Sequence, residues 1–183
     1  MLHTFLNEQN KTQVAATLQQ CCASEKWVTR MIASRPFTDS SEVLSQASSI
    51  WESLAEVDFL QAFAAHPQIG DVKTLQAKYA NTQAIASSEQ SQVATASDDT
   101  IEQLALANQL YLKRFGFIFI ICATGKSADE MLTALLARIG NSRQQEIENA
   151  AAEQLKITIL RLSRIKSSVV NRQLSEPSNQ FHP

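Results

Sequence analysis

The sequence predicts an all-α fold, a single-domain helical bundle, and three observations carry that prediction. Only four glycines and four prolines occur in 183 residues, so few turns are obligatory. In most segments, apolar residues recur at the three- and four-residue spacing that places them on one face of a helix. Two segments, Ser127 to Glu130 and Ser142 to Gln145, have the capping-box pattern that opens a helix.

The first part of the chain is expected to hold five short helices. Each combines an apolar face with a start or stop signal, such as Ser24 before the second helix and Arg35-Pro36 at its end. The helices are Thr12 to Ala23, Ser24 to Arg35, a segment capped by Ser40 or Ser41 that runs to Leu54, Val57 to Ala65, and Asp71 to Ala80.

Three longer helices are expected in the second part. Asp98 and Asp99 can cap the first of them, and their charge favours a helix N-terminus. The three helices run from these aspartates to Arg114, from Ser127 to Ile139, and from Ser142 to about Ser167.

The run Phe115 to Ala123 does not fit this pattern. It is almost entirely apolar and lacks the alternation of an amphipathic helix. It is expected to be buried, either as a strand or as the start of a core helix. Its backbone N–H and C=O groups could contact a ligand if they are not paired within a helix.

The chain shows no internal repeat and no domain boundary. Residues 81–97 are polar and rich in Ser, Ala and Gln, which is the composition of a linker. The expected organisation is one helical domain over residues 1–167 and a polar C-terminal tail over residues 168–183.

Charge and composition exclude several classes of protein. The formal net charge is −2 and no Lys/Arg run exceeds two residues, which argues against a general nucleic-acid binder. The longest apolar run is too short to span a bilayer, so no membrane association is expected. Nucleotide-binding, hydrolase-elbow and metal-ligand motifs are absent, so the sequence gives no support to nucleotide binding, α/β-hydrolase chemistry or a local metal site.

The three cysteines, Cys21, Cys22 and Cys122, predict no disulfide framework, because their number is odd and two are adjacent. The first ten residues lack a secretory pattern, and the last four are not a peroxisomal address. A reduced, cytoplasmic location is expected.

His66 is the first candidate for chemistry. It lies at a helix end beside Pro67, with Gly70 close behind, so its ring is held at a sharp corner of the chain. Imidazole titrates near ~6.5, which suits proton transfer at neutral pH. The alternative is that His66 only caps the helix or satisfies a buried carbonyl group. Glu89 lies in a polar stretch and becomes a candidate only if the fold brings it near His66.

Arg161 is the second candidate. In the last helix Ile147, Leu155 and Leu162 belong to one apolar stripe, and Arg161 lies at its edge beside Gln154. At this edge the guanidinium either reaches water or points into a pocket at a carboxylate. Glu153 is expected on the opposite, solvated side.

Several of these segments occur together, in a fixed order, in one family. They are Cys21-Cys22-Ala-Ser24 with Trp27; Arg35-Pro36-Phe37; His66-Pro67 with Ile69-Gly70; Glu89-Gln90; Asn108-x-x-Tyr111-x-x-Arg114-Phe115-Gly116-Phe117-x-Phe119; and Asn141-Ser142-Arg143 followed by Glu153-Gln154-x-Lys156-Ile157 and Leu160-Arg161-Leu162. In this the chain resembles the 2-oxo-4-hydroxy-4-carboxy-5-ureidoimidazoline (OHCU) decarboxylases, from about Phe5 to Leu162.

The resemblance implies an all-helical homodimer that converts OHCU to (S)-allantoin in urate degradation, without metal or organic cofactor. It implies that His66 is the proton donor, Glu89 its polar partner and Arg161 the carboxylate-facing group. It also implies a substrate pocket formed by Pro67, Ala86, Ser87, Ser88, Glu89, Gln90, Phe119, Ile120, Ile121, Cys122 and Ala123.

Two positions depart from the family pattern. Ala86 stands where the family commonly has Ser, and Gln68 stands where an Arg or an acidic residue is common. Two alternatives stay open. Instead of an OHCU decarboxylase, the chain could be a non-enzymatic helical module that binds a ligand or partner, or a decarboxylase of a related ureido-imidazolone acid.

Overall fold

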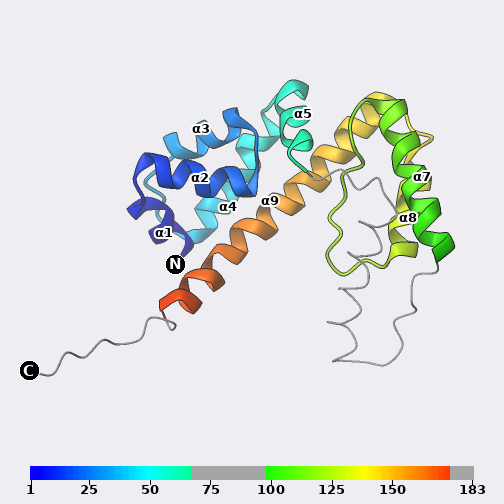
Figure 1. Ribbon diagram of the computed structural model, residues 1–183. Helices are drawn as coiled ribbons and strands as arrows, with labels where there is room; N and C mark the ends of the chain where they lie inside the picture. The colour runs from blue at the N-terminus through cyan, green and yellow to red at the C-terminus, as the bar shows by residue number, and fades with distance from the viewer. Residues whose placement is uncertain (67–97, 174–183) are drawn as a thin grey trace, which may run out of the picture. The chain divides into compact units, whose positions relative to one another are not determined.

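The computed structural model describes residues 1–66 and 98–173, and every regular element in these ranges is an α-helix (Figure 1). The helices are α1 (Leu2–Glu8), α2 (Lys11–Cys21), α3 (Glu25–Ala33), α4 (Ser40–Glu52), α5 (Glu56–Ala64), α7 (Asp98–Phe115), α8 (Ala128–Arg138) and α9 (Arg143–Gln173). The predicted all-α fold is confirmed. The helix predicted over Asp71 to Ala80 lies outside the described residues.

The described chain divides into two compact units. The first contains Met1–Asp58 and the described residues from Leu155 onward, and the second contains Phe59–Gln154. The boundaries fall inside α5 and α9. None of the described helices is long and apolar enough to cross a membrane.

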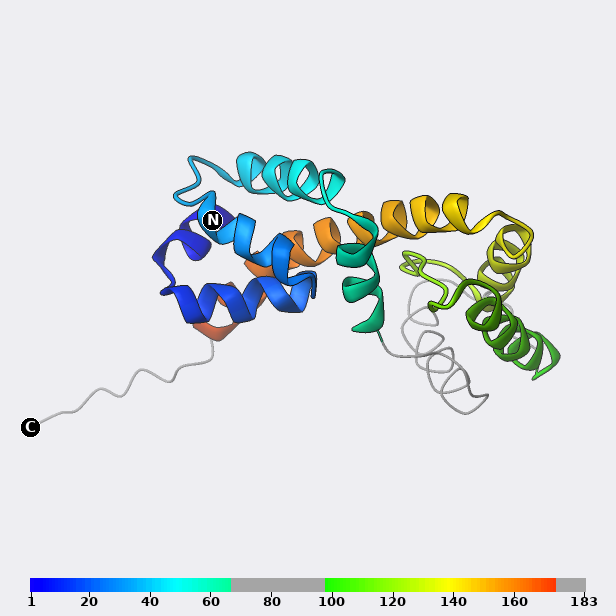
Figure 2. The same ribbon diagram turned by 90° about the horizontal axis from the view of Figure 1, so that it is seen from above.

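In the first unit, α2 packs on α3, and α4 packs on both α3 and α1 (Figure 2). The indole rings of Trp27 and Trp51 are buried in this helical layer. The Trp27 Nε1–H donates to Ala47 O at 3.0 Å, so the buried indole keeps its hydrogen bond.

Helix α1 has no counterpart among the predicted helices. Its apolar residues are Leu2, Phe5 and Leu6, of which Leu2 and Leu6 are buried, and a segment of seven residues is too short for periodicity to indicate a helix. Arg35 contacts the end of α1, because its Nη1 donates to Leu6 O at 2.7 Å and to Gln9 O at 2.8 Å. Because Arg35 lies far from α1 in the sequence, the sequence of α1 alone does not predict this contact.

Two predicted helix caps are confirmed, and two predictions are corrected: Asp98 and Asp99 lie within the first turn of α7 and do not precede it. Ser24 accepts from Trp27 N at the start of α3, and Ser127 forms the predicted capping box of α8. Helix α4 is capped by Asp39 and not by Ser40 or Ser41. A carboxylate at this position accepts from two backbone N–H groups at once, which a hydroxyl does less readily.

In the second unit, α7 packs on α8, and an aromatic cluster lies between the helices and the connection that follows α7. Tyr111 is its centre, with ring centroids 4.6 Å from Phe115, 5.8 Å from Phe117 and 5.2 Å from Phe119. Phe63 of α5 joins the cluster through Phe117, at 5.5 Å.

The run Phe115 to Ala123 is neither of the two predicted structures. Phe115 ends α7, Gly116 adopts a φ of 79°, and the chain then runs without regular structure to α8. Phe117 and Ile120 are buried as expected, whereas the residues from Ile121 to Ala123 are only partly buried. Glycine at residue 116 is suited to this exit, because φ values near +80° are strained for other residues.

The end of α9 also differs from the prediction. The helix continues to Gln173, beyond the limit expected near Ser167. Residues 174–183, which make up most of the predicted tail, lie outside the described residues.

Candidate active site

The structure describes three of the predicted site components. His66 and the segment Phe119–Ala123 belong to the second unit, and Arg161 belongs to the first. Pro67 and the stretch Ala86–Gln90, which contains Glu89, lie outside the described residues.

His66 follows α5, and hydrogen bonds hold both its backbone and its ring. Its backbone N–H donates to Phe63 O at 3.1 Å, which continues the helical turn. Its ring Nε2 lies 2.5 Å from Oε1 of Gln154. Because an amide oxygen only accepts, Nε2 carries a hydrogen in this arrangement. The ring is thereby oriented by a residue far away in the sequence.

Gln154 is a residue that sequence reasoning missed. Its side chain is 1 % exposed, and a buried carboxamide requires hydrogen-bond partners. Every fourth residue of α9 from Glu146 to Leu162 is buried, and three of these five side chains are polar: Glu146, Gln154 and Thr158. Polar residues at that spacing, inside a buried helix face, are the signal that could have identified Gln154.

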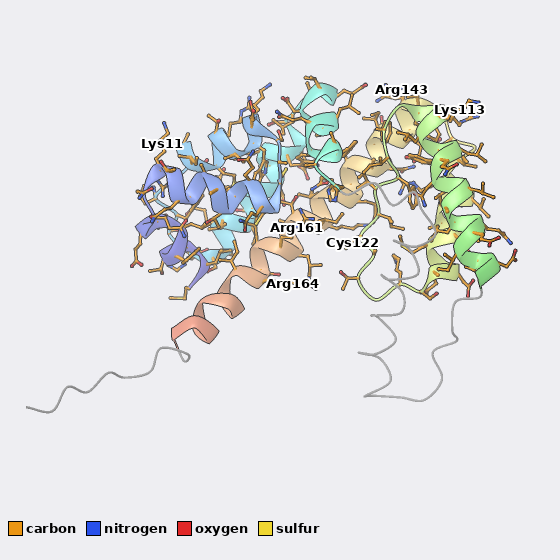
Figure 3. The ribbon with its side chains drawn as sticks, viewed as in Figure 1. Lys11, Lys113, Cys122, Arg143, Arg161 and Arg164 are labelled. Atoms are coloured by element: carbon orange, nitrogen blue, oxygen red, sulfur yellow. The ribbon has the colours of Figure 1, made fainter. Side chains whose placement is uncertain are left out.

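The segment Phe119–Ala123 is held by side chains at two backbone groups. Cys122 N donates to Oε2 of Glu153 at 2.7 Å, and Ile120 O accepts from Nη1 of Arg138 at 2.9 Å. Figure 3 shows Cys122 on the irregular connection between α7 and α8. The expectation that Glu153 faces solvent was wrong: it is partly buried, because its carboxylate binds this connection.

Glu153 and Gln154 are therefore neighbours on α9 with complementary contacts. Glu153 fixes the backbone at Cys122, and Gln154 fixes the ring of His66. One turn of one helix thus anchors the candidate acid and the candidate substrate-binding segment, all within the second unit.

Behind the segment lies a buried ionic network. Glu146 is fully buried and accepts hydrogen bonds from Arg138, Tyr111, Asn141 and Asn149. Burial by itself raises the pKa of Glu146, but these hydrogen bonds, led by those from Arg138, outweigh burial and hold the pKa below its ordinary value. Burial and the hydrogen bond to Glu146 raise the pKa of Tyr111, so its hydroxyl stays protonated and donates.

Arg161 is partly buried on α9 (Figure 3) and contacts the end of α2. Its Nη1 donates to Gln20 O at 3.2 Å and to Cys21 O at 3.3 Å, two of the terminal carbonyl groups of that helix. The two neighbouring thiols are inert as nucleophiles: burial raises the pKa of Cys21 and of Cys22 to about 11, against the opposing effect of the Arg161 charge.

Within the described part of the chain, no group of three or more His, Cys, Asp or Glu side chains is placed to hold a metal ion. The described cysteines Cys21, Cys22 and Cys122 are all free thiols.

Comparison with known proteins gives a consistent result. The family model described as OHCU decarboxylase matches residues 7–163. A uric acid degradation bifunctional protein of Arabidopsis thaliana is 40% identical over 164 residues, which are 89% of this chain and 50% of that protein. An OHCU decarboxylase of Amia calva is 31% identical over 133 residues, 72% of this chain and 74% of that protein.

Among solved structures, a crystal structure of OHCU decarboxylase in the presence of (S)-allantoin matches with a TM-score of 0.65 and 39% identity. The match covers 81% of this chain and 96% of that one. The chain spans half the length of the Arabidopsis relative and about a third of the Bacillus subtilis bifunctional protein, to which it is 26% identical.

Proposed function

The chain belongs to the OHCU decarboxylase family, and we propose that it converts OHCU to (S)-allantoin in urate degradation, as a carboxy-lyase that needs no cofactor. The observation that carries the proposal is the pair of contacts made by Glu153 and Gln154 in the second unit. These contacts orient a histidine and a stretch of irregular backbone, which suit proton transfer and the binding of a polar ring, respectively.

The proposed reaction uses the electronic structure of the substrate. The bond between the ring carbon and its carboxylate breaks, CO2 leaves, and the electron pair is delocalised into the adjacent C=N bond of the ring. The hydroxyl-bearing carbon that lost CO2 is then doubly bonded to the neighbouring, ureido-bearing carbon. Protonated His66 gives one proton to this ureido-bearing carbon and becomes neutral, and solvent restores its proton. The hydroxyl proton passes to the ring nitrogen as the hydroxyl-bearing carbon becomes the carbonyl carbon of allantoin. The balance is one carboxylate and one proton consumed for one C–H bond and one CO2.

The hydrogen bond to Gln154 bears on which ring nitrogen reacts. Gln154 accepts from Nε2–H, so the proton that His66 transfers comes from Nδ1 while this bond is intact. Since a fixed ring delivers its proton from a fixed direction, the product is expected to have one handedness.

The remaining roles come from the family resemblance. Arg161 orients the substrate carboxylate. Its guanidinium has five N–H donors on three nitrogen atoms, and one of these nitrogens, Nη1, donates to carbonyl groups at the end of α2. Glu89 is the polar partner of His66. Pro67, Ala86–Gln90 and Phe119–Ala123 hold the ureido and ring groups of the substrate.

The test of the activity uses substrate made in place. Urate is treated with a urate oxidase and the following hydrolase, and circular dichroism of the product is recorded with and without this protein. Spontaneous decay gives racemic allantoin and no lasting signal. We expect rapid appearance of the (S)-allantoin signal with the protein present. A racemic product at the spontaneous rate, from folded protein, would reject the activity in favour of a binding module.

The role of Gln154 is tested by Gln154→Leu, with Gln144→Leu as the matched control on the exposed side of the same helix. Loss of the acceptor releases the ring of His66, and we expect kcat to fall by about 10²-fold, as for other small misplacements of a catalytic group. The control variant is expected to keep the wild-type kcat. Equal kcat values for both variants would contradict the assignment.

We also propose that the chain acts as a homodimer in the cytoplasm. The dimer is supported by exposed leucines of the second unit: Leu106 and Leu110, one turn apart on α7, are 61% and 58% exposed, and Leu136 on α8 is 51% exposed. A reducing compartment is supported by the three free thiols. Light scattering after gel filtration should give twice the chain mass, and Leu106→Lys/Leu110→Lys should shift it to the monomer. A monomeric wild type would contradict the dimer.

A further inference from the structure

We propose that Arg138 is a positioning residue for substrate binding, which sets the direction of the backbone groups at Ile121. This inference rests on the proposed function, because it concerns the segment Phe119–Ala123 that is proposed to hold the substrate. It adds a residue on α8 that lies outside that segment and outside the candidate catalytic groups.

Arg138 contacts two consecutive residues of the segment. Its Nη1 donates to Ile120 O at 2.9 Å, and its guanidinium carbon lies 4.7 Å from the ring centroid of Phe119. A planar guanidinium with donors in a fixed fork can make both contacts at once, which the ammonium group of lysine cannot do.

The guanidinium is itself held rigidly by Glu146. Its Nε donates to both carboxylate oxygens, at 3.2 and 3.0 Å, and Nη2 donates to Oε2 at 2.9 Å. The carboxylate is fixed in turn by Tyr111 Oη at 2.5 Å, Asn141 Nδ2 at 2.7 Å and Asn149 Nδ2 at 2.8 Å. The position of Ile120 O is therefore determined by α7, α8 and α9 together.

The contacts of Arg138 and Glu153 lie on either side of Ile121. In a trans peptide the C=O and N–H bonds point in opposite directions, and both peptides of Ile121 are trans. Because Arg138 holds Ile120 O, the N–H of Ile121 points away from Arg138. Because Glu153 holds Cys122 N, the C=O of Ile121 points away from Glu153.

Ile121 therefore presents its N–H as a hydrogen-bond donor and its C=O as an acceptor, each in a fixed direction. A ureido group offers the complement, an N–H donor and a C=O acceptor a few atoms apart, so the arrangement favours a ureido-bearing substrate. Without regular structure in this segment, the two side-chain contacts are what define the direction of these groups.

The experiment compares Arg138→Lys with Arg114→Lys in the wild-type chain. Arg114 is a matched control, because it also donates to backbone carbonyls of the second unit, at Gly140 and Asn141, but not to the segment. For Arg138→Lys we expect KM to rise about tenfold with kcat changed less than about threefold. The reason is that an interaction which stabilises the bound substrate and the transition state equally affects KM alone when it is removed.

A purely structural role gives a different pattern. Partial unfolding lowers the concentration of active enzyme, which reduces apparent kcat and leaves KM unchanged. We expect Arg114→Lys to keep the wild-type KM. An unchanged KM in folded Arg138→Lys would overturn the inference, and so would an equal rise of KM in Arg114→Lys.

If Arg138→Lys does not fold, the double variant Arg138→Met/Glu146→Gln replaces it. That pair leaves no buried charge, and the Gln amide oxygen still accepts from Tyr111. It should fold and show the same rise of KM; a wild-type KM would overturn the inference.

An inactive wild type would instead reject the proposed function. The affinity of each folded variant for (S)-allantoin, measured by calorimetry, then tests Arg138 alone: about tenfold weaker binding is expected, and equal binding contradicts it.

Discussion

Replacing Arg138 by Met removes the cation from a buried ion pair and should strongly destabilise the protein. The Glu146 carboxylate is fully buried and lies 2.9 Å from Nη2 of Arg138, whose own side chain is only 14% exposed. A buried charge that loses its partner costs roughly 3–5 kcal/mol. Tyr111, Asn141 and Asn149 still donate to the carboxylate, so we expect the lower end, about 3 kcal/mol.

The loss is measured by urea unfolding followed by far-UV circular dichroism, which reports all helices. A loss of about 3 kcal/mol corresponds to a fall in Tm of roughly 6–12 °C for a chain of this length. Fluorescence of Trp27 and Trp51 reports the first unit separately, because both lie there. If the two signals no longer coincide in the variant, the second unit unfolds first.

The double variant Arg138→Met/Glu146→Gln completes the test. With no charge left to bury, it should recover at least half of the lost free energy of unfolding. A loss of unfolding free energy below about 1 kcal/mol in the single variant is what an exposed ion pair contributes. It would show that the buried Glu146 carboxylate does not need Arg138. A double variant less stable than the single one would also refute the reasoning.

Three further predictions follow from single contacts. The pKa of Glu146 is lower in the folded state than in the unfolded state, so the stabilisation by its carboxylate is complete above the unfolded pKa of ~4.3 and is lost as the pH falls through the folded pKa. The difference in unfolding free energy between wild type and Glu146→Gln should therefore shrink with acidification. A difference that does not change with pH would contradict this prediction. Ser24→Ala removes the N-cap of α3 and should cost about 1 kcal/mol in urea unfolding, whereas no change would mean that the cap is replaced. A thiol reagent at neutral pH should modify Cys122 first, and Cys21 and Cys22 only on unfolding, because burial raises the pKa of Cys21 and of Cys22 to about 11; equal rates in folded protein would contradict this order.

Helices with local signals were predictable from the sequence. Ser127 caps the start of α8, because its hydroxyl accepts from the backbone N–H of Glu130 while the Glu130 carboxylate accepts from the backbone N–H of Ser127. Helix α1 was not predictable in this way, since Arg35 holds its end from a distant part of the chain.

The conformation of the apolar run Phe115 to Ala123 was not predictable from its composition. Composition favoured a strand or a helix between Phe115 and Ala123. The observed backbone is irregular because Arg138 and Glu153 supply hydrogen bonds that a helix or sheet would otherwise supply. Both side chains come from helices later in the chain.

The candidate site was predictable in part. His66 was recognisable by its place beside a proline at a helix end, and the structure gives that ring a partner, Gln154. Gln154 and Glu153 were missed as contacts because the stripe through Ile147, Leu155 and Leu162 placed Gln154 only at its edge and Glu153 on the opposite side. The direction of a polar side chain on a partly buried helix depends on what packs against it, which periodicity alone does not contain.

The central claim is that His66 protonates the ureido-bearing ring carbon after CO2 is lost. The most direct measurement is the enantiomeric excess of allantoin formed from freshly generated OHCU, for wild type and for His66→Gln, whose amide can still donate to Gln154 but cannot transfer a proton. We predict nearly pure (S)-allantoin from wild type and racemic product at the spontaneous rate from the variant. Fast formation of (S)-allantoin by His66→Gln would contradict the account.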